Sequence, residues 1–397
     1  KSNNKSDTHI WVTGISYADT MMTLDISKQW IQTGFPQKFI PETGASPLVY
    51  GNLYKNGNVG IFASSGRFIH AWGPGGAGLF PYPDSVQAMR FDSVIVTLPL
   101  AIFAEDTIST FFGPPSLGDL NGDDTLEVVA ATMDGRIYAW HPYDRNGDGR
   151  ADVLDGFPVQ LGEKISMNPV VANFDGDPSN LEILVGGENG LLKLIDGNGL
   201  VKYEQSYQGK ITGLAKGDSL GAFYILMEKQ NRGYISRESF TNPSMPPFST
   251  REIPAVNNSL PISGDINRDG QLEVIVAGAD GKVYAWDSFL NPLPGFPVET
   301  GVNMYKVNPV LGDLNNDGFL EIVLAYQDKI YAYSYNGAAI DNFPVTVSHP
   351  GGPTDLIESS PIMGDVDGDG YPEIIVGTTD NRILAYNKDG RMVDGFP

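Results

Sequence analysis

An acidic loop near the end of the chain has the residue types and spacing of a calcium site. Carboxylates stand at positions 1, 3 and 5 of residues 365–373, a glycine at position 6 and another carboxylate at position 9. Calcium takes roughly six to eight oxygen ligands at about 2.3–2.6 Å, and a tight loop of this spacing can point them inward. Position 7 commonly adds its backbone carbonyl, so its side chain is free to vary. The loop therefore predicts a bound calcium ion.

The same loop recurs about every 50 residues, with a longer first interval. A repeat of this length is typical of propellers and solenoids, whose units bury a core only by stacking on one another. Five copies keep their acids, and two worn copies have lost most of them. The five loops begin at Asp119, Asn173, Asp265, Asp313 and Asp365, and the worn copies begin at Asn52 and Asp218.

Each loop lies inside a larger repeated pattern. A short strand precedes the loop, and a β-branched run such as residues 373–376 follows it. A turn such as residues 279–282 then leads into an aromatic strand such as residues 283–286, and the unit closes with Gly-Phe-Pro, as at 295–297. Val, Ile, Tyr and Trp suit packed strand faces, and Asp-Gly suits a hairpin. The pattern predicts one four-stranded antiparallel blade per unit.

Together these units predict an all-β fold, a single β-propeller domain over residues 9–397. Residues 9–36 resemble the last strands of a blade that lacks its first strand, and residues 75–109 form an insertion of roughly a strand pair. A closed ring has no exposed strand edges. We expect a seven-bladed ring, with an eight-bladed ring as the alternative. The polar residues 1–8 are expected to form a disordered linker.

The overall composition limits the classes of partner and site. The 397 residues include 48 acidic and 26 basic side chains and no cysteine, and the formal charge is −22. This charge argues against nucleic acid and anionic membranes as partners, and the lack of cysteine excludes disulfides and thiolate zinc sites. No apolar run reaches the roughly 20 residues that span a bilayer. The chain starts at Lys1 without a signal-peptide pattern, so we expect a mature or excised fragment.

The acidic loops after Pro-x-x-Gly, together with the closing Gly-Phe-Pro, resemble the FG-GAP/VCBS repeats. These repeats build the β-propellers of integrin α-subunits and of many secreted bacterial proteins. The resemblance covers about residues 44–397 and is strongest over 115–200 and 258–397. It implies that each of the five better loops holds calcium, with the backbone carbonyl acting at position 7. The implied ligands are Asp119, Asn121, Asp123, Thr125 and Glu127; Asn173, Asp175, Asp177 and Glu182; Asp265, Asn267, Asp269, Gln271 and Glu273; Asp313, Asn315, Asp317, Phe319 and Glu321; and Asp365, Asp367, Asp369, Tyr371 and Glu373.

Two of these loops depart from the family pattern. Asp124 stands where the family has glycine, which places a left-handed backbone conformation on an aspartate. In the loop that begins at Asn173, the Pro178-Ser-Asn insertion delays Glu182 by one position. Glu182 therefore stands at position 10 of its loop, whereas the other glutamates stand at position 9.

A sixth acidic loop lies outside the register of the repeat. It follows an aromatic strand, has the same ligand spacing and resembles the calcium loops of dockerin-type repeats. We expect a calcium ion there to order a surface excursion of the chain. Its ligands would be Asp144, Asn146, Asp148, the Arg150 carbonyl and Asp152.

Simpler interpretations exist for each of these features. Asp, Asn and Gly favour turns for backbone reasons alone, but five loops in register favour calcium. The histidines, at positions 9, 70, 141 and 349, are far apart, and His141 is expected to be a strand-end residue rather than a base. The chain has no Gly-x-Ser-x-Gly elbow and no phosphate-binding glycine loop. Aromatic strands could stack on sugars, but their repetition favours blade packing.

The resemblance implies a binding or adhesion module of a secreted or cell-surface bacterial protein, stabilised by about five or six structural Ca²⁺ ions. Its ligand would be a protein or a carbohydrate, bound on the face opposite the loops or on the inserted segments. We expect other domains in a larger chain, and neither nucleic acid nor membrane insertion. Enzymatic activity is left open, with binding favoured. The alternatives are a polysaccharide lyase or hydrolase, or a lectin, built on a calcium-binding propeller.

Overall fold

The computed structural model is built from β-strands throughout the part of the chain that it describes. No helix in that part is long and apolar enough to cross a membrane. The all-β class predicted from the strand pattern is confirmed. The described residues are 10–13, 25–28, 49–53, 59–73, 79, 88–91, 94–97, 102–177, 180–241, 249–254, 259–304, 307–348, 356–357, 360–379 and 382–393.

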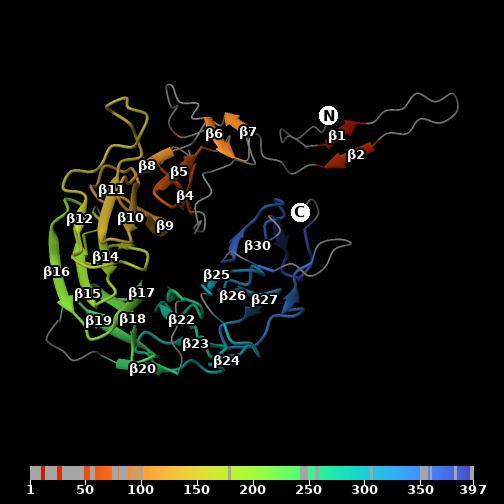
Figure 1. Ribbon diagram of the computed structural model, residues 1–397. Helices are drawn as coiled ribbons and strands as arrows, with labels where there is room; N and C mark the ends of the chain where they lie inside the picture. The colour runs from red at the N-terminus through yellow and green to blue at the C-terminus, as the bar shows by residue number, and fades with distance from the viewer. Residues whose placement is uncertain are drawn as a thin grey trace, which may run out of the picture.

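Seven antiparallel sheets follow one another in chain order, and each matches one repeat unit. Figure 1 shows them around a common centre, from blade 1 in orange to blade 7 in blue. Six of the sheets have four strands, and the last has three within the described residues. The predicted seven-bladed propeller is therefore confirmed. The Gly395-Phe-Pro end of blade 7 lies outside the described residues.

Blades 1 to 4 contain both worn copies and two of the acidic loops. Blade 1 consists of β3 (Val49–Asn52), β4 (Val59–Ser65), β5 (Phe68–Trp72) and β8 (Ile102–Glu105). Blade 2 consists of β9 (Phe111–Gly118), β10 (Glu127–Thr132), β11 (Arg136–Trp140) and β12 (Val159–Gln160). Blade 3 consists of β13 (Val170–Ala172), β14 (Glu182–Gly186), β15 (Leu191–Ile195) and β16 (Val201–Ser206). Blade 4 consists of β17 (Lys210–Lys216), β18 (Ala222–Lys229), β19 (Arg232–Ser239) and β20 (Ser249–Ile253).

Blades 5 to 7 are the most regular copies. Blade 5 consists of β21 (Ile262–Gly264), β22 (Glu273–Ala277), β23 (Lys282–Trp286) and β24 (Val298–Glu299). Blade 6 consists of β25 (Val310–Gly312), β26 (Glu321–Tyr326), β27 (Lys329–Tyr333) and β28 (Val345–Thr346). Blade 7 consists of β29 (Ile362–Gly364), β30 (Glu373–Gly377) and β31 (Ile383–Tyr386).

Two hairpins form separate two-stranded sheets. β1 (Ile10–Thr13) pairs with β2 (Asp25–Lys28) inside the region predicted as a partial blade, 9–36. β6 (Ala88–Phe91) pairs with β7 (Val94–Thr97) inside the predicted insertion, 75–109. The rest of these two regions is described only in part, and the predicted linker at 1–8 lies outside the described residues.

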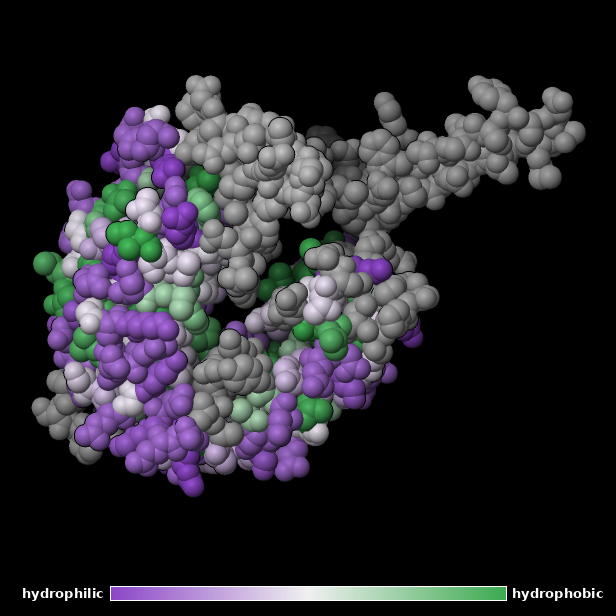
Figure 2. All heavy atoms as spheres, in the orientation of Figure 1, coloured by the Kyte–Doolittle hydropathy of each residue, from purple (hydrophilic) through white to green (hydrophobic). Residues whose placement is uncertain are grey.

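The five larger hydrophobic cores each lie between two or three neighbouring blades. One core packs Phe62 of blade 1 against Val128 of blade 2, and another packs Ile275 of blade 5 against Tyr331 of blade 6. Every residue of the second strands β10, β14 and β22 is buried, because these strands are covered on both sides. Figure 2 shows hydrophilic side chains over much of the visible surface around these cores.

The antiparallel order gives the ring two different faces. The first strands of neighbouring blades lie next to each other, as β17, β21, β25 and β29 do in succession. Since strands alternate in direction, the connections from first to second strand share one face with those from third to fourth strand. We call this the acidic-loop face. The hairpins between second and third strands lie on the opposite face.

The Gly-Phe-Pro sequences lead into the fourth strands. The peptide bonds Phe157–Pro158, Phe296–Pro297 and Phe343–Pro344 are cis, and each proline directly precedes β12, β24 or β28. Gly156 and Gly295 have φ values of 87° and 86° just before these bonds, in the region that favours glycine.

Candidate metal sites

The acidic loops connect the first and second strands of blades 2, 3, 5, 6 and 7. Their last acid is in every case the first residue of the second strand. This holds for Glu182 as well, although the sequence places it one position late. The fold therefore brings the five loops to the same place in their blades, on the acidic-loop face.

The carboxylate at position 1 organises the loop backbone. In blade 7, Asp365 accepts hydrogen bonds from the N–H groups of Gly368 at 2.7 Å and Gly370 at 3.1 Å. The N–H of Tyr371 donates to Asp369 at 2.8 Å, so position 5 fixes position 7. Blades 5 and 6 repeat the bond from position 6 to position 1 at 3.0 and 2.8 Å. These bonds fix the path of the loop backbone in blades 5, 6 and 7.

Two positions of the loop require a left-handed backbone. Position 6 has φ values of 84°, 88° and 91° at Gly270, Gly318 and Gly370. Asp124, which replaces glycine there in blade 2, has φ 67°, as predicted from the sequence. Position 4 is also left-handed, which the sequence reasoning did not anticipate. Arg268 adopts φ 62° there.

The glutamate at position 9 is buried, and one of its oxygens is fixed by the loop backbone. The N–H of position 2 donates to Oε2 of Glu127 at 2.8 Å, Glu273 at 3.0 Å and Glu321 at 2.7 Å. Burial, with the nearby aspartates, raises the pKa of each of these three carboxyls to about 7. A cation in the loop would favour their ionised form.

Blade 7 contains an unsatisfied acceptor that faces its loop. Glu373 Oε2 accepts the N–H of Val366 at 2.9 Å, while the buried Oε1 has no hydrogen-bond partner among the described residues. One donor atom each from Asp365, Asp367 and Glu373 lie within 4.8 Å of one another. Buried acceptors are normally satisfied, and a set of carboxylate oxygens suits a hard cation such as Ca²⁺. The residues of this loop therefore fit a calcium ion.

Blade 2 adds a nitrogen donor to its loop. Donor atoms of Asp123, Glu127 and His141 lie within 4.8 Å of one another, and His141 Nδ1 is 3.4 Å from Glu127 Oε1. The imidazole follows β11 directly and stacks on Tyr143 with ring centroids 4.6 Å apart. Sequence reasoning placed His141 at a strand end but did not connect it with this loop. Imidazole suits transition metals better than calcium.

The off-register loop repeats the same backbone pattern. Asp144 accepts the N–H groups of Gly147 and Gly149, both at 2.7 Å. The last acid, Asp152, accepts the N–H of Arg145 at position 2 with a distance of 2.9 Å. The glutamates at position 9 of the other loops accept the N–H of position 2 in the same way. The loop is held against blade 1 by an ion pair of 2.9 Å between Arg150 and Glu105.

The acidic loops also join neighbouring blades. The N–H before the last acid donates to a backbone carbonyl of the preceding blade in three places, at Leu126, Leu181 and Leu320. These bonds reach Leu53 at 3.0 Å, Asp119 at 3.0 Å and Ile266 at 3.4 Å, respectively. A loop that changes shape would therefore disturb the junction between two blades as well as its own blade.

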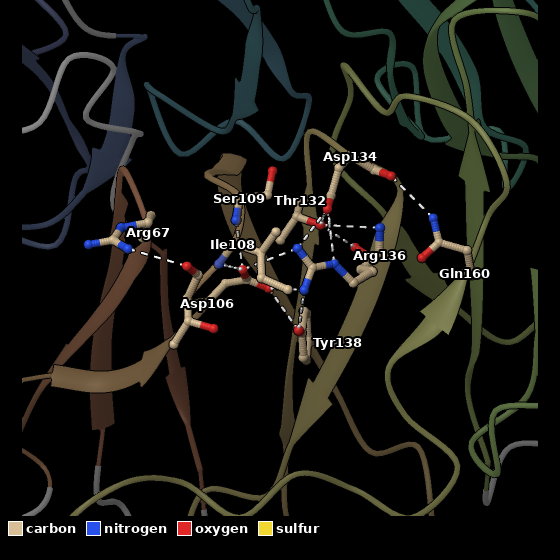
Figure 3. A network of polar contacts seen from close by, with 10 residues as sticks. Arg67, Asp106, Ile108, Ser109, Thr132, Asp134, Arg136, Tyr138 and Gln160 are labelled. Atoms are coloured by element: carbon tan, nitrogen blue, oxygen red, sulfur yellow. Dashed lines mark hydrogen bonds and ion pairs between the residues drawn. The ribbon is translucent and has the colours of Figure 1, made fainter.

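A different polar network joins blades 1 and 2 on the opposite face (Figure 3). Arg136 forms ion pairs with the buried Asp106 at 2.9 Å and with Asp134 at 2.6 Å. Tyr138 donates to Asp106 at 2.7 Å, and the N–H groups of Ile108 and Ser109 donate to the same carboxylate. Although burial opposes ionisation, these hydrogen bonds hold the pKa of Asp106 below its usual value. The network links blades 1 and 2 through protein groups.

The family model of the FG-GAP-like repeat matches residues 313–376. This stretch contains the acidic loops of blades 6 and 7, and the seven-bladed ring surrounds it. The chain is a seven-bladed β-propeller that contains an FG-GAP-like repeat. No curated protein matches the propeller.

Solved structures similar to the FG-GAP-like propeller share its fold at low sequence identity. BBS1N, solved in complex with ARL6DN, has a TM-score of 0.54 and 12% identity, over 91% of this chain and 96% of that one. A rhamnogalacturonan lyase of Bacillus licheniformis, PL11, has a TM-score of 0.51 and 14% identity, over 98% and 75%. The exotype rhamnogalacturonan lyase YesX has a TM-score of 0.50 and 15% identity, over 71% and 56%. At such identities, the similarity concerns the fold alone.

Proposed function

We propose that this propeller is a calcium-stabilised binding module. Loops in blades 2, 5, 6 and 7 and the off-register loop would each hold one Ca²⁺ through the carboxylate, amide and carbonyl oxygens named above. The observation that carries the proposal is the buried Glu373 Oε1 beside Asp365 and Asp367, which has no hydrogen-bond partner in the part of the chain that the structure describes. Acids repeated in five of the seven blades suit a structural role, because a ligand site is built once on a ring.

The calcium proposal is tested by thermal unfolding. Binding to the native state alone adds about RT ln(1 + [Ca²⁺]/Kd) to the unfolding free energy for each site. We expect EDTA to lower the melting temperature by more than about 5 °C and re-added Ca²⁺ to restore it. Mg²⁺ at the same concentration serves as the control, because it demands tighter octahedral geometry. Unchanged melting in EDTA would contradict the proposal.

The binding surface is proposed on the opposite face or on the inserted segment 75–109. Hairpins of the opposite face differ from blade to blade, for example Asp134-Gly135 in blade 2 and Gln327-Asp328 in blade 6, whereas the acidic loops repeat. The ligand would be a protein or a carbohydrate. The module would act on the outside of a bacterial cell, as part of a larger protein, without inserting into membrane or binding nucleic acid.

A polysaccharide-active enzyme is the second candidate. It is favoured by the two rhamnogalacturonan lyases that share the fold. Cleavage of acidic glycans, measured as new unsaturated or reducing ends, would favour this candidate over a binding module. Glycan binding without cleavage would support the binding module and point to a lectin.

A further inference from the structure

The acidic loop of blade 3 contains a contact with a lysine of its own blade. Lys202 lies on β16, and its Nζ forms an ion pair with Asp175 Oδ2 and lies 3.4 Å from Glu182 Oε1. Asp175 is the acid at position 3, and Glu182 is the acid that begins the second strand. The ammonium therefore contacts two of the oxygens that would face an ion in this loop.

The loops of blades 5, 6 and 7 differ from that of blade 3 in this respect. Among the described residues, no lysine or arginine forms an ion pair with Glu273, Glu321 or Glu373. In blade 3 the Lys202 ammonium contacts both Asp175 and Glu182, and the Glu182 side chain is only 2% exposed. An ammonium supplies one positive charge and three donors at a place where Ca²⁺ would supply two charges.

The sequence of this loop also opposes the backbone path of the others. Position 6 is left-handed in blades 2, 5, 6 and 7, but blade 3 has Pro178 there. Proline is restricted to φ near −65° and cannot adopt a positive φ. A one-residue insertion also delays Glu182, the acid that closes the loop.

Blade 4 shows the same replacement in a more worn copy. Its loop keeps one acid, Asp218, and Arg237 of β19 contacts it at 3.0 Å. The two side chains are 7% and 16% exposed, so the pair is largely shielded from solvent. In both blades, an acid of the loop is neutralised by a basic side chain from a later strand of the same blade.

We infer that the Lys202 ammonium occupies the cation site of blade 3 in place of calcium. This inference rests on the proposed calcium sites of the other loops, and it divides the ring into two parts. Blades 3 and 4 carry their own cations, whereas blades 2, 5, 6 and 7 take theirs from solution.

Native mass spectrometry in Ca²⁺ tests this assignment by counting bound ions. Asp175→Asn should keep the wild-type count, whereas the matched variant Asp367→Asn in blade 7 should lose one ion. Lys202→Met, which removes the ammonium but keeps an unbranched side chain as far as Cε, should gain one ion. Loss of an ion from Asp175→Asn, or an unchanged count in Lys202→Met, would overturn the inference.

A second measurement does not depend on calcium in any loop. In EDTA, Lys202→Met should lower the melting temperature by roughly 2–6 °C, because it leaves the buried Glu182 without its cation. Lys210→Met is the control, since it breaks a 2.9 Å pair with Glu188 between partly exposed side chains, and it should change melting less. Equal melting of Lys202→Met and wild type would overturn the inference. If wild type binds no calcium, the proposed function fails, but this comparison still decides the role of Lys202.

Discussion

Buried carboxylates at the starts of second strands meet different neighbours in different blades. Glu373 has an oxygen without a hydrogen-bond partner among the described residues, Glu127 faces His141, and Glu182 faces Lys202. Ionising a carboxyl in a buried position is costly unless a positive charge or a donor compensates it. The same residue at the same place is therefore compensated in different ways, and this difference governs which blades depend on metal.

Glu238 of β19 is a half-buried carboxyl that is not part of an acidic loop. Burial raises its pKa to about 7, and Tyr203 and Tyr207 of blade 3 lie near it. Because the folded pKa exceeds the usual 4.5, the protonated form favours folding below about pH 4.5, and this contribution is lost as the pH rises through 7. Glu238→Gln should therefore increase the unfolding free energy at pH 8, on the order of 1–3 kcal/mol, and leave it unchanged near pH 4.5.

Chemical denaturation of wild type and variant at several pH values measures this difference. The titration of the acidic loops is the same in both proteins, so it cancels in the difference between their unfolding free energies. Glu299→Gln, at a side chain that is 77% exposed, should show no such pH dependence. A stabilisation by Glu238→Gln that is the same at both pH values would contradict the burial argument.

The sequence predicted some of these residues and not others, for a physical reason. The positions of the acids and the left-handed Asp124 follow from spacing within nine residues, because one loop determines them. Lys202 and His141 come from other strands, and only strand pairing brings them to the loop. Such contacts leave no spacing pattern, although Pro178 indicated that blade 3 differs.

At the scale of elements, the acidic loop acts through its backbone as much as through its acids. Gly370 has φ 91°, and a Cβ added there would meet no atom within 4 Å. Gly370→Val would therefore add no collision, but it would force a β-branched residue into the left-handed region. We expect a loss of about 1–3 kcal/mol of unfolding free energy and weaker calcium binding by blade 7.

Unfolding in urea with and without Ca²⁺ measures both effects. Gly364→Ala is the matched control in the same blade, since it too has open space around its Cβ and does not have a positive φ. If Gly364→Ala and Gly370→Val lower the unfolding free energy by the same amount, position 6 does not require a left-handed backbone.

The strands themselves were largely predictable from the repeated pattern. The runs of β-branched and aromatic residues became second and third strands, and the Gly-Phe-Pro sequences led into fourth strands. The worn copies also became blades, because apolar strands such as β18 still pack against both neighbours after the acids are lost. The blade count was less certain from sequence, since residues 9–36 looked like part of another blade.

At the scale of the whole molecule, calcium in the acidic loops would stabilise the junctions between blades. The N–H of Leu320 in blade 6 donates to blade 5, and the Asn316 side chain donates to Gly370 of blade 7 at 2.6 Å. Chelation should therefore speed hydrogen exchange in blades 5 to 7 by about tenfold or more, while β14 and β18 of blades 3 and 4 keep their protection.

Hydrogen–deuterium exchange read by mass spectrometry measures this pattern in EDTA and in Ca²⁺. A sample with Mg²⁺ controls for ionic strength. Uniform acceleration around the ring would mean that the blades open together and that blades 3 and 4 have no protection of their own.

The placement of the cores between blades has a consequence for how such a chain can change length. Removal of one whole blade exposes an apolar surface on each of its two neighbours. Because the blades are repeats, these two surfaces are equivalent to the pair that meets at any other junction. Gain or loss of a whole repeat therefore preserves every kind of junction, whereas loss of half a repeat leaves one apolar surface bare. Gene duplication in units of one blade is the change in length that this architecture tolerates best.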